Sequence, residues 1–304
     1  MSVTLIAVVI ALVIGHTMPA LASLRRYDWL VGWLDWLDAQ AGDNVAWRSG
    51  WGLLLALAVP LLPVLLLQLA LRNDMYGLPG FLFAVLMLFY AWGPRDLDHD
   101  VDAVAAATDA AARRDTAMRL YPEREDVSLD GGELVGAVFR CALWRWFGVL
   151  FWFLLLGPFG ALLYRLVALC AQGEARKRLP EGSAQAASAV LAVLDWPVAQ
   201  LMTLAMALVG DFDSVLGAWK DNGGASFTSG NGFLTAAARA SVHSELAEEA
   251  MDEAGNGFDP GAGTLSPAGA PGLPELRDAM SLVWRILLSW LAVLALFVIA
   301  GWVA

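Results

Sequence analysis

The residues best suited to chemistry lie in an acidic stretch, RDLDHDVD, which follows an apolar segment. Asp96 and Asp100 are four residues apart, and so are Asp98 and Asp102, so each pair would share one face of a helix. Carboxylate oxygens are the ligands that Mg²⁺ prefers in proteins, so these four residues are candidate metal ligands. The alternative is a solvated helix start, because acids in a first turn complement the helix dipole.

A second candidate is Asp195, the one acid between Gly182 and Gly210 in an otherwise apolar segment. A carboxylate at membrane depth is costly and therefore marks a candidate functional site. Arg165, in the preceding apolar segment, is the candidate ion partner of Asp195. The alternative is that Asp195 binds backbone groups freed by Pro197. No catalytic residue is assigned, and the candidate polar site comprises Arg95, Asp96, Asp98, His99, Arg165 and Asp195.

The composition excludes some classes of protein. Of 304 residues, 59% are hydrophobic and 16% are charged, which is typical of an integral membrane protein. The net charge of −11 argues against nucleic-acid binding, which needs a basic surface. No phosphate-binding glycine loop, HExxH or GxSxG motif occurs, so no cofactor is expected and Mg²⁺ remains the candidate ion.

Six apolar segments are long enough to place these residues in a bilayer, since about 20 helical residues cross its hydrocarbon core. The expected fold is an all-α, polytopic membrane helix bundle with helical cytoplasmic loops. The predicted spans are residues 3–24, 51–71, 76–92, 141–171, 183–210 and 282–304.

Residues 141–171 are central to this prediction, because residues 146–164 carry no charge and are flanked by Arg145 and Arg165. We expect one span with a kink or a break at Gly157 and Pro158, since proline removes a helical hydrogen bond. The break would serve either helix packing or a site lined by broken helix.

The polar segments complete the domain organisation. Residues 23–38 are amphipathic and predict either an interfacial helix or a packing helix. Helices are expected at 101–120 and 232–249, a basic loop at 172–182, and a flexible linker at the Gly- and Pro-rich residues 254–274. The predicted parts are 1–92, 93–140, 141–210, 211–281 and 282–304.

The distribution of Lys and Arg predicts the orientation, because positive residues prefer the cytoplasmic side. Six spans with both termini outside would place 14 of them inside and 5 outside.

Three stretches together resemble the AmpE family, namely RDLDHDVDAV, LFWFLLLGPFGALLYRLV and VLDWPVAQLMTLAMALVGDFDSVLGAW. The resemblance covers roughly residues 1–245 and the final helix. It implies a multi-pass protein of the bacterial inner membrane that is associated with β-lactamase regulation and ampicillin resistance. On that basis we expect a sensor or regulator that catalyses no reaction.

The stretch GPFGALLYRLV is also similar to the CobD/CbiB membrane enzymes of cobalamin synthesis. The alternative function is therefore an enzyme related to adenosylcobinamide-phosphate synthase with a magnesium or nucleotide site. Against it, the chain lacks the acidic stretch before Val149 and the Asn and Asp after Arg165, and Gln200 stands where an arginine is expected. A transporter is a third hypothesis, although no corresponding pair of broken helices occurs. The expected partners are the lipid bilayer, a protein or a small cell-wall-derived ligand, and a second copy of the chain, but no nucleic acid.

Overall fold

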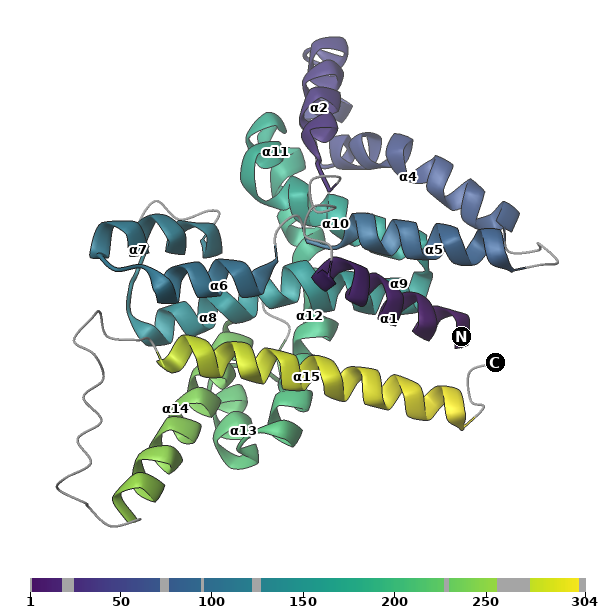
Figure 1. Ribbon diagram of the computed structural model, residues 1–304. Helices are drawn as coiled ribbons and strands as arrows, with labels where there is room; N and C mark the ends of the chain where they lie inside the picture. The colour runs from purple at the N-terminus through teal and green to yellow at the C-terminus, as the bar shows by residue number, and fades with distance from the viewer. Residues whose placement is uncertain are drawn as a thin grey trace. The chain divides into compact units, whose positions relative to one another are not determined.

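The computed structural model describes residues 2–17, 25–71, 77–93, 96–121, 127–226, 230–255 and 274–300. Every regular element in these ranges is a helix (Figure 1). The chain divides into two compact units. Unit 1 comprises Met1–Asp96, Leu143–Val198 and Leu291–Ala304, and unit 2 comprises Leu97–Ala142 and Ala199–Trp290.

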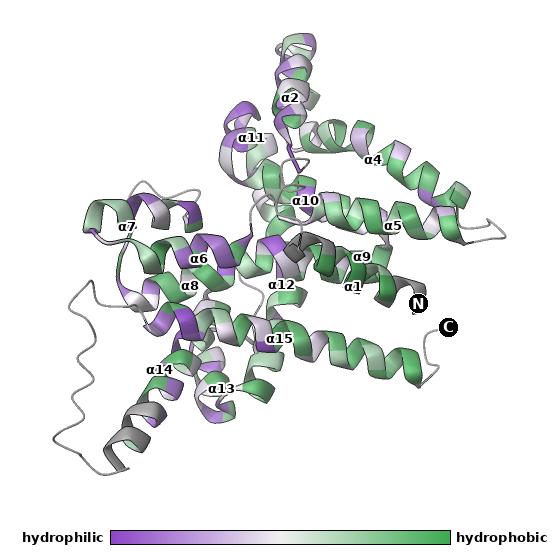
Figure 2. Ribbon diagram, viewed as in Figure 1, coloured by the Kyte–Doolittle hydropathy of each residue, from purple (hydrophilic) through white to green (hydrophobic). Residues whose placement is uncertain are grey.

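Four stretches of helix are long and apolar enough to cross a membrane, namely Trp51–Leu71, Gly131–Leu156, Glu181–Val209 and Pro274–Ile299. Only 22% of the most apolar window of Trp51–Leu71 is buried within the chain, and Leu54 and Leu66 on this helix are exposed. Figure 2 shows the same hydrophobic character along α4 (Trp51–Leu71) and α5 (Leu78–Ala91). Hydrophilic residues gather on α2 (Asp28–Ala41), α6 (Leu97–Ala106) and α7 (Ala110–Ala117). Because water would not cover so large an apolar surface, the protein is an all-α membrane helix bundle, as the sequence predicts.

Unit 1 holds most of the apolar helices. Helix α1 packs on α5, while α10 contacts α4, α5 and α9. The unit consists of α1 (Ser2–Thr17), α2 (Asp28–Ala41), α3 (Val45–Arg48), α4 (Trp51–Leu71), α5 (Leu78–Ala91), the π-helix η3 (Leu143–Phe147), α9 (Gly148–Leu156), α10 (Pro158–Ala171), α11 (Gly173–Arg178), the first part of α12 (Glu181–Val209) and the end of α15 (Pro274–Ile299).

The predicted single span over residues 141–171 is wrong, because the chain reverses at Gly157. This glycine has a φ of +72°, and α10 begins at Pro158 and packs back along α9. Gly148 and Tyr164 consequently lie in contact. In a continuous helix, sixteen residues would separate them by about 24 Å. The missing N–H of proline and the left-handed glycine together make a helical hairpin where a kink or a break within one span was expected.

Unit 2 contains α6 (Leu97–Ala106), α7 (Ala110–Ala117), η2 (Met118–Leu120), α8 (Gly131–Ala142), α13 (Phe212–Asp221), α14 (Gly232–Gly255), the end of α12 after Val198 and the larger part of α15, up to Trp290. Helix α14 packs on α8 and α13, and the ion pair of Arg239 with Glu133 joins α14 to α8 at 2.9 Å. A second ion pair, between Arg285 and Glu245, joins α15 to α14. The predicted helix at 232–249 is thus confirmed and extends to Gly255.

Other predicted elements differ in detail. The helix expected at 101–120 is divided, because the Asp109 side chain accepts a hydrogen bond of 2.6 Å from Ala112 N and begins a new helix there. Helix α2 begins at Asp28, and the basic loop at 172–182 contains the short helix α11. The predicted linker falls mostly on 256–273, outside the described residues.

Candidate functional site

Asp195 forms the centre of a buried polar cluster in unit 1. The side chain is 3% exposed. Its Oδ1 accepts a hydrogen bond of 2.6 Å from the Tyr164 hydroxyl, and its Oδ2 accepts one of 2.9 Å from Trp144 Nε1. We call Asp195, Tyr164 and Trp144 the Asp195 cluster. It connects α12, α10 and η3 through one carboxylate, and it places Asp195 inside the bundle, as the sequence predicts.

Local backbone features place the two donors of the Asp195 cluster. Trp144 lies in the π-helix η3, a helix type that occurs frequently at functional sites. Tyr164 is fully buried, and its ring fills the space beside Gly148. A neighbouring hydrogen bond of 3.2 Å, from Trp152 Nε1 to the carbonyl of Leu194, fixes α9 against the same part of α12.

Arg165 does not form the ion pair with Asp195 that the sequence suggested. Among the described contacts, its guanidinium carbon lies 5.6 Å from the centroid of the Tyr27 ring, and its Nε has no hydrogen-bond partner. Arg165 is only 5% exposed. The reason lies in helix geometry: successive residues point about 100° apart, so only Tyr164 faces Asp195.

A second buried arginine, Arg25, lies in the same unit. It is 5% exposed, donates from Nη1 to the carbonyl of Gly93 at 3.1 Å, and stacks over the Phe89 ring at 4.2 Å. Burial lowers the pKa of the Arg25 guanidinium, an effect that the nearby charge of Asp96 opposes. Arg25 and Arg165 are called the arginine pair below.

Tyr27 lies beside the arginine pair. Its hydroxyl donates a hydrogen bond of 2.7 Å to the carbonyl of Tyr90, near the end of α5. Burial raises the pKa of the Tyr27 hydroxyl above its usual range, although the charge of Arg165 opposes this shift. The phenol is therefore a neutral donor rather than a counter-ion for the arginines.

Gln68 stabilises the hairpin turn at Gly157. Its Nε2 donates to the carbonyl of Leu156 at 3.0 Å, and its Oε1 accepts from Phe159 N at 2.8 Å. One side chain of α4 thus satisfies a carbonyl and an N–H at the break between α9 and α10, as backbone at membrane depth requires.

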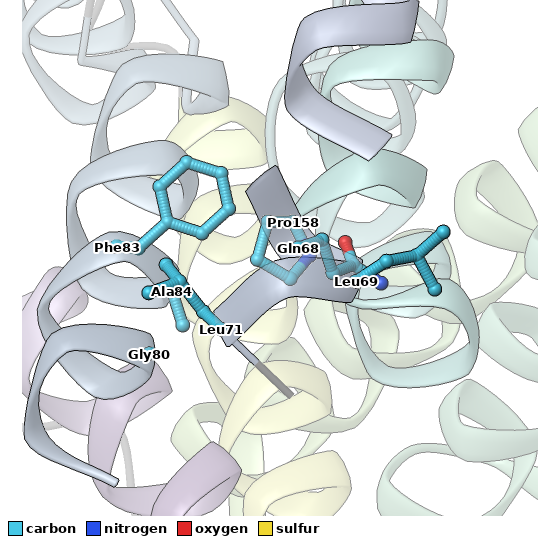
Figure 3. A pocket seen from close by; sticks show the side chains of 7 residues that line it. All are labelled: Gln68, Leu69, Leu71, Gly80, Phe83, Ala84 and Pro158. Carbon is cyan, nitrogen blue, oxygen red and sulfur yellow. The ribbon is translucent and has the colours of Figure 1, made fainter. Parts of the chain in front are cut away.

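Beside this turn, a cavity of about 260 Å³ is lined mainly by apolar side chains. Figure 3 shows Gln68 and Pro158 at its edge, with Phe83 and Ala84 of α5 opposite. Side chains of α4, α5 and α10 therefore meet beside the break, and both expected roles of the break, helix packing and a site lined by broken helix, stay predictions.

The acidic stretch is dispersed rather than gathered. Asp98 Oδ1 accepts a hydrogen bond of 2.9 Å from Trp284 Nε1, within unit 2. Asp100 is buried, with 3% exposure, whereas Asp102 is exposed, so these two acids lie on different faces of α6. Asp96 precedes the helix and belongs to unit 1.

The metal site predicted at Asp96, Asp98, Asp100 and Asp102 gains no support from the described side chains and stays a prediction. No group of three or more His, Cys, Asp or Glu side chains in the described ranges is placed to hold a metal ion. The i, i+4 spacing holds within each pair, but Asp98 and Asp100 point about 200° apart around the helix. His99 is exposed, and Arg95 lies outside the described residues.

Several residues of this region were not singled out from the sequence, namely Trp144, Tyr164, Arg25, Tyr27 and Gln68. A usable signal existed for Gln68, which is the one polar side chain in the apolar stretch of α4. For Tyr164 and Trp144 no comparable signal existed, because aromatic residues are common throughout the apolar segments.

A family model described as "Regulatory signalling modulator protein AmpE" matches residues 49–255, about two thirds of the chain. No curated protein and no solved structure matches the chain. The matched region includes α4, α5, α10, α12 and the whole Asp195 cluster.

Proposed function

Because the chain belongs to the AmpE family of regulatory signalling modulator proteins, we propose that it is a regulator in the bacterial inner membrane that takes part in β-lactamase induction. In this proposal the protein catalyses no reaction. It changes conformation when a protein partner or a small cell-wall-derived ligand binds.

The observation that carries the proposal is the Asp195 cluster. One buried carboxylate joins α12 to α10 and η3 through hydrogen bonds of 2.6 and 2.9 Å. A ligand or partner that moved Tyr164 or Trp144 would leave a buried acceptor unsatisfied, which typically costs about 1–3 kcal/mol. Binding of an effector at one site typically changes the binding free energy at a distant site by about 1–3 kcal/mol, which is a similar amount. The Asp195 cluster is thus suited to hold α12 in one position without the ligand or partner and to release it when the ligand or partner moves Tyr164 or Trp144.

One contact weighs against the alternative of a cobalamin-type enzyme. Gln200 stands where those enzymes are expected to have an arginine. Its Oε1 accepts from Trp219 Nε1 at 2.8 Å, and its Nε2 donates to the carbonyl of Gly224. Both ends of the amide therefore bind α13 and the turn that follows it, and glutamine offers a substrate no positive charge.

The proposal is tested in a bacterium that carries an inducible β-lactamase and lacks its own copy of this protein. β-lactamase activity is measured with and without a β-lactam inducer, after return of the wild type, Asp195→Ala or Asp213→Ala. We expect the wild type and Asp213→Ala, whose carboxylate is exposed, to restore normal induction, and Asp195→Ala to fail. Membrane levels of each variant are measured by immunoblot. Identical induction with and without the wild-type protein would refute the link to β-lactamase.

A further inference from the structure

Arg25 and Arg165 are both buried in unit 1, and neither forms an ion pair with any described residue. Each is 5% exposed, and in each the Nε is buried without a hydrogen-bond partner. A guanidinium carries five N–H donors and cannot lose its charge in a protein. Two such groups out of water are an unusual arrangement that the Asp195 cluster does not explain, because Asp195 is bound by Tyr164 and Trp144.

Aromatic contacts do not offset the burial of these charges. The guanidinium carbons lie 4.2 Å from the Phe89 ring centroid for Arg25 and 5.6 Å from that of Tyr27 for Arg165, whose side chain is also hydrogen-bonded to Tyr27. The attraction between a cation and an aromatic ring is smaller than the free-energy cost of removing an ion from water. The balance is unfavourable for both arginines unless an anion joins them.

The electrostatic surroundings favour an anion further. Arg165 acts on Arg25 as a like charge and lowers its pKa, in addition to the larger effect of burial. Arg145, a third cation, lies within electrostatic range of Arg165. Among the described charges, Asp96 is the one acid that acts on the arginine pair, and it acts on Arg25. No described acid offsets the charge of Arg165.

The position of Arg25 favours a ligand at the membrane surface. Arg25 lies between α1 and α2, and its hydrogen bond goes to Gly93, just beyond the end of α5. The neighbouring aromatic residues Trp29 and Tyr90 are joined by a hydrogen bond of 2.7 Å. Trp and Tyr favour the headgroup level of a bilayer. An oxyanion of a lipid headgroup and a dissolved oxyanion could both reach this level.

We propose that Arg25 and Arg165 bind a phosphate group between them. Guanidinium forks match phosphate oxygens bidentately. Inorganic phosphate near pH 7 carries about −1.5 to −2 charges, as a phosphomonoester does, and a lipid phosphodiester carries one. The unpartnered Nε atoms supply donors for this contact. The site is distinct from the Asp195 cluster and does not depend on the link to β-lactamase, so phosphate binding and induction can be tested separately.

The test measures the thermal stability of the purified full-length protein with two probes. The first probe is inorganic phosphate added in detergent, with chloride at equal ionic strength as the control. The second is a nanodisc of phosphatidylglycerol, compared with one of a neutral galactosyl diacylglycerol, whose headgroup contains no phosphate. A ligand that binds only the native state raises Tm in proportion to the logarithm of its concentration once the site is nearly saturated. A rise with inorganic phosphate identifies dissolved phosphate as the source, and a rise only in phosphatidylglycerol identifies a lipid headgroup.

Variants show whether the arginine pair is responsible. We expect Arg25→Gln and Arg165→Gln to abolish the rise in Tm. The control Arg178→Gln should keep it, because Arg178 is half-exposed and already bound to Asp35 at 3.2 Å. If Arg165→Gln does not fold, Arg165→Lys retains the charge but not the fork, and it should raise the half-saturating phosphate concentration at least about tenfold. The proposal is overturned if neither probe stabilises the wild type, or if all variants respond as the wild type does.

Discussion

The ring of Tyr164 occupies the space that a side chain at position 148 would need. A Cβ built on Gly148 would lie 2.1 Å from Tyr164 Cζ, well inside van der Waals contact. This contact exists only because α10 folds back along α9, and it aims the Tyr164 hydroxyl at Asp195. The hairpin and the Asp195 cluster therefore depend on one another.

Gly148→Ala should separate α9 from α10. Overpacking of this kind typically costs about 1–3 kcal/mol, and we expect a fall of that size in the free energy of unfolding. The control is Gly32→Ala in α2, where an added Cβ meets nothing within 4 Å. Alanine is the better helix former, so the control should be neutral or slightly stabilising. Unfolding in mixed micelles measures both variants, and equal stabilities would contradict the hairpin contact.

Tyr164→Phe should destabilise the protein by removing a donor to a buried carboxylate. Hydrogen bonds to charged groups are worth about 1.5–3 kcal/mol, so the free energy of unfolding should fall by that amount. Tyr90→Phe is the matched control, because the Tyr90 hydroxyl forms its hydrogen bonds at an exposed position. If the two variants lose equal free energy of unfolding, the hydrogen bond from Tyr164 to Asp195 adds no more stability than an exposed tyrosine hydroxyl does.

Gln68→Met should weaken the turn at Gly157, because methionine keeps the length of the side chain but cannot bond to Leu156 or Phe159. Each unsatisfied backbone group costs about 1–3 kcal/mol. Hydrogen exchange at the turn should accelerate, and the melting temperature should fall. Gln185→Met is the control, since Gln185 is exposed and bonds only to Glu181 in the described contacts. A turn with unchanged exchange would contradict the bridging role of Gln68.

Asp211 should make the stability of the α13–α14 region depend on pH. Hydrogen bonds from Ser214 and Ser244 lower the pKa of this carboxyl below 3.8. The pKa of Asp211 is lower in the folded state than in the unfolded state. The contribution of Asp211 to the free energy of unfolding is therefore fully present above pH 3.8 and is lost as the pH falls through the folded-state pKa. Asp211→Asn should therefore be less stable than the wild type at pH 6, and the difference should vanish in acid. A difference that persists below the folded-state pKa would show that the charge is not responsible.

The hairpin also changes the expected topology. Gln68 lies near the end of α4 and contacts the turn at Gly157, so we predict that α9 and α10 each cross the membrane. If α12 does not cross the membrane, both termini remain outside. Seventeen of the Lys and Arg residues then lie on the cytoplasmic side, Arg72 lies outside, and Arg165 lies within a span. This split follows the positive-inside rule better than the one predicted from six simple spans. Reporter fusions at Asn222 and Ala304 should report cytoplasm and periplasm, respectively, and a periplasmic signal at Asn222 would refute this topology.

The apolar segments could be recognised from the sequence because helix formation and membrane insertion depend on nearby residues. Residues 51–71 were predicted with the bounds that α4 has, and the stretch after Gly232 was predicted as a helix. The cost of a carboxylate in an apolar helix is equally local, so the burial of Asp195 followed from its neighbours in sequence.

The partners of these residues required the tertiary structure. Tyr164 and Arg165 are adjacent in the chain, and only the packing of α12 against one face of α10 decides which of them reaches Asp195. The turn at Gly157 likewise depends on Gln68, about ninety residues earlier, whose amide bonds to both sides of the break. Contacts between residues so distant in sequence depend on how helices pack, which hydrophobic periodicity does not encode.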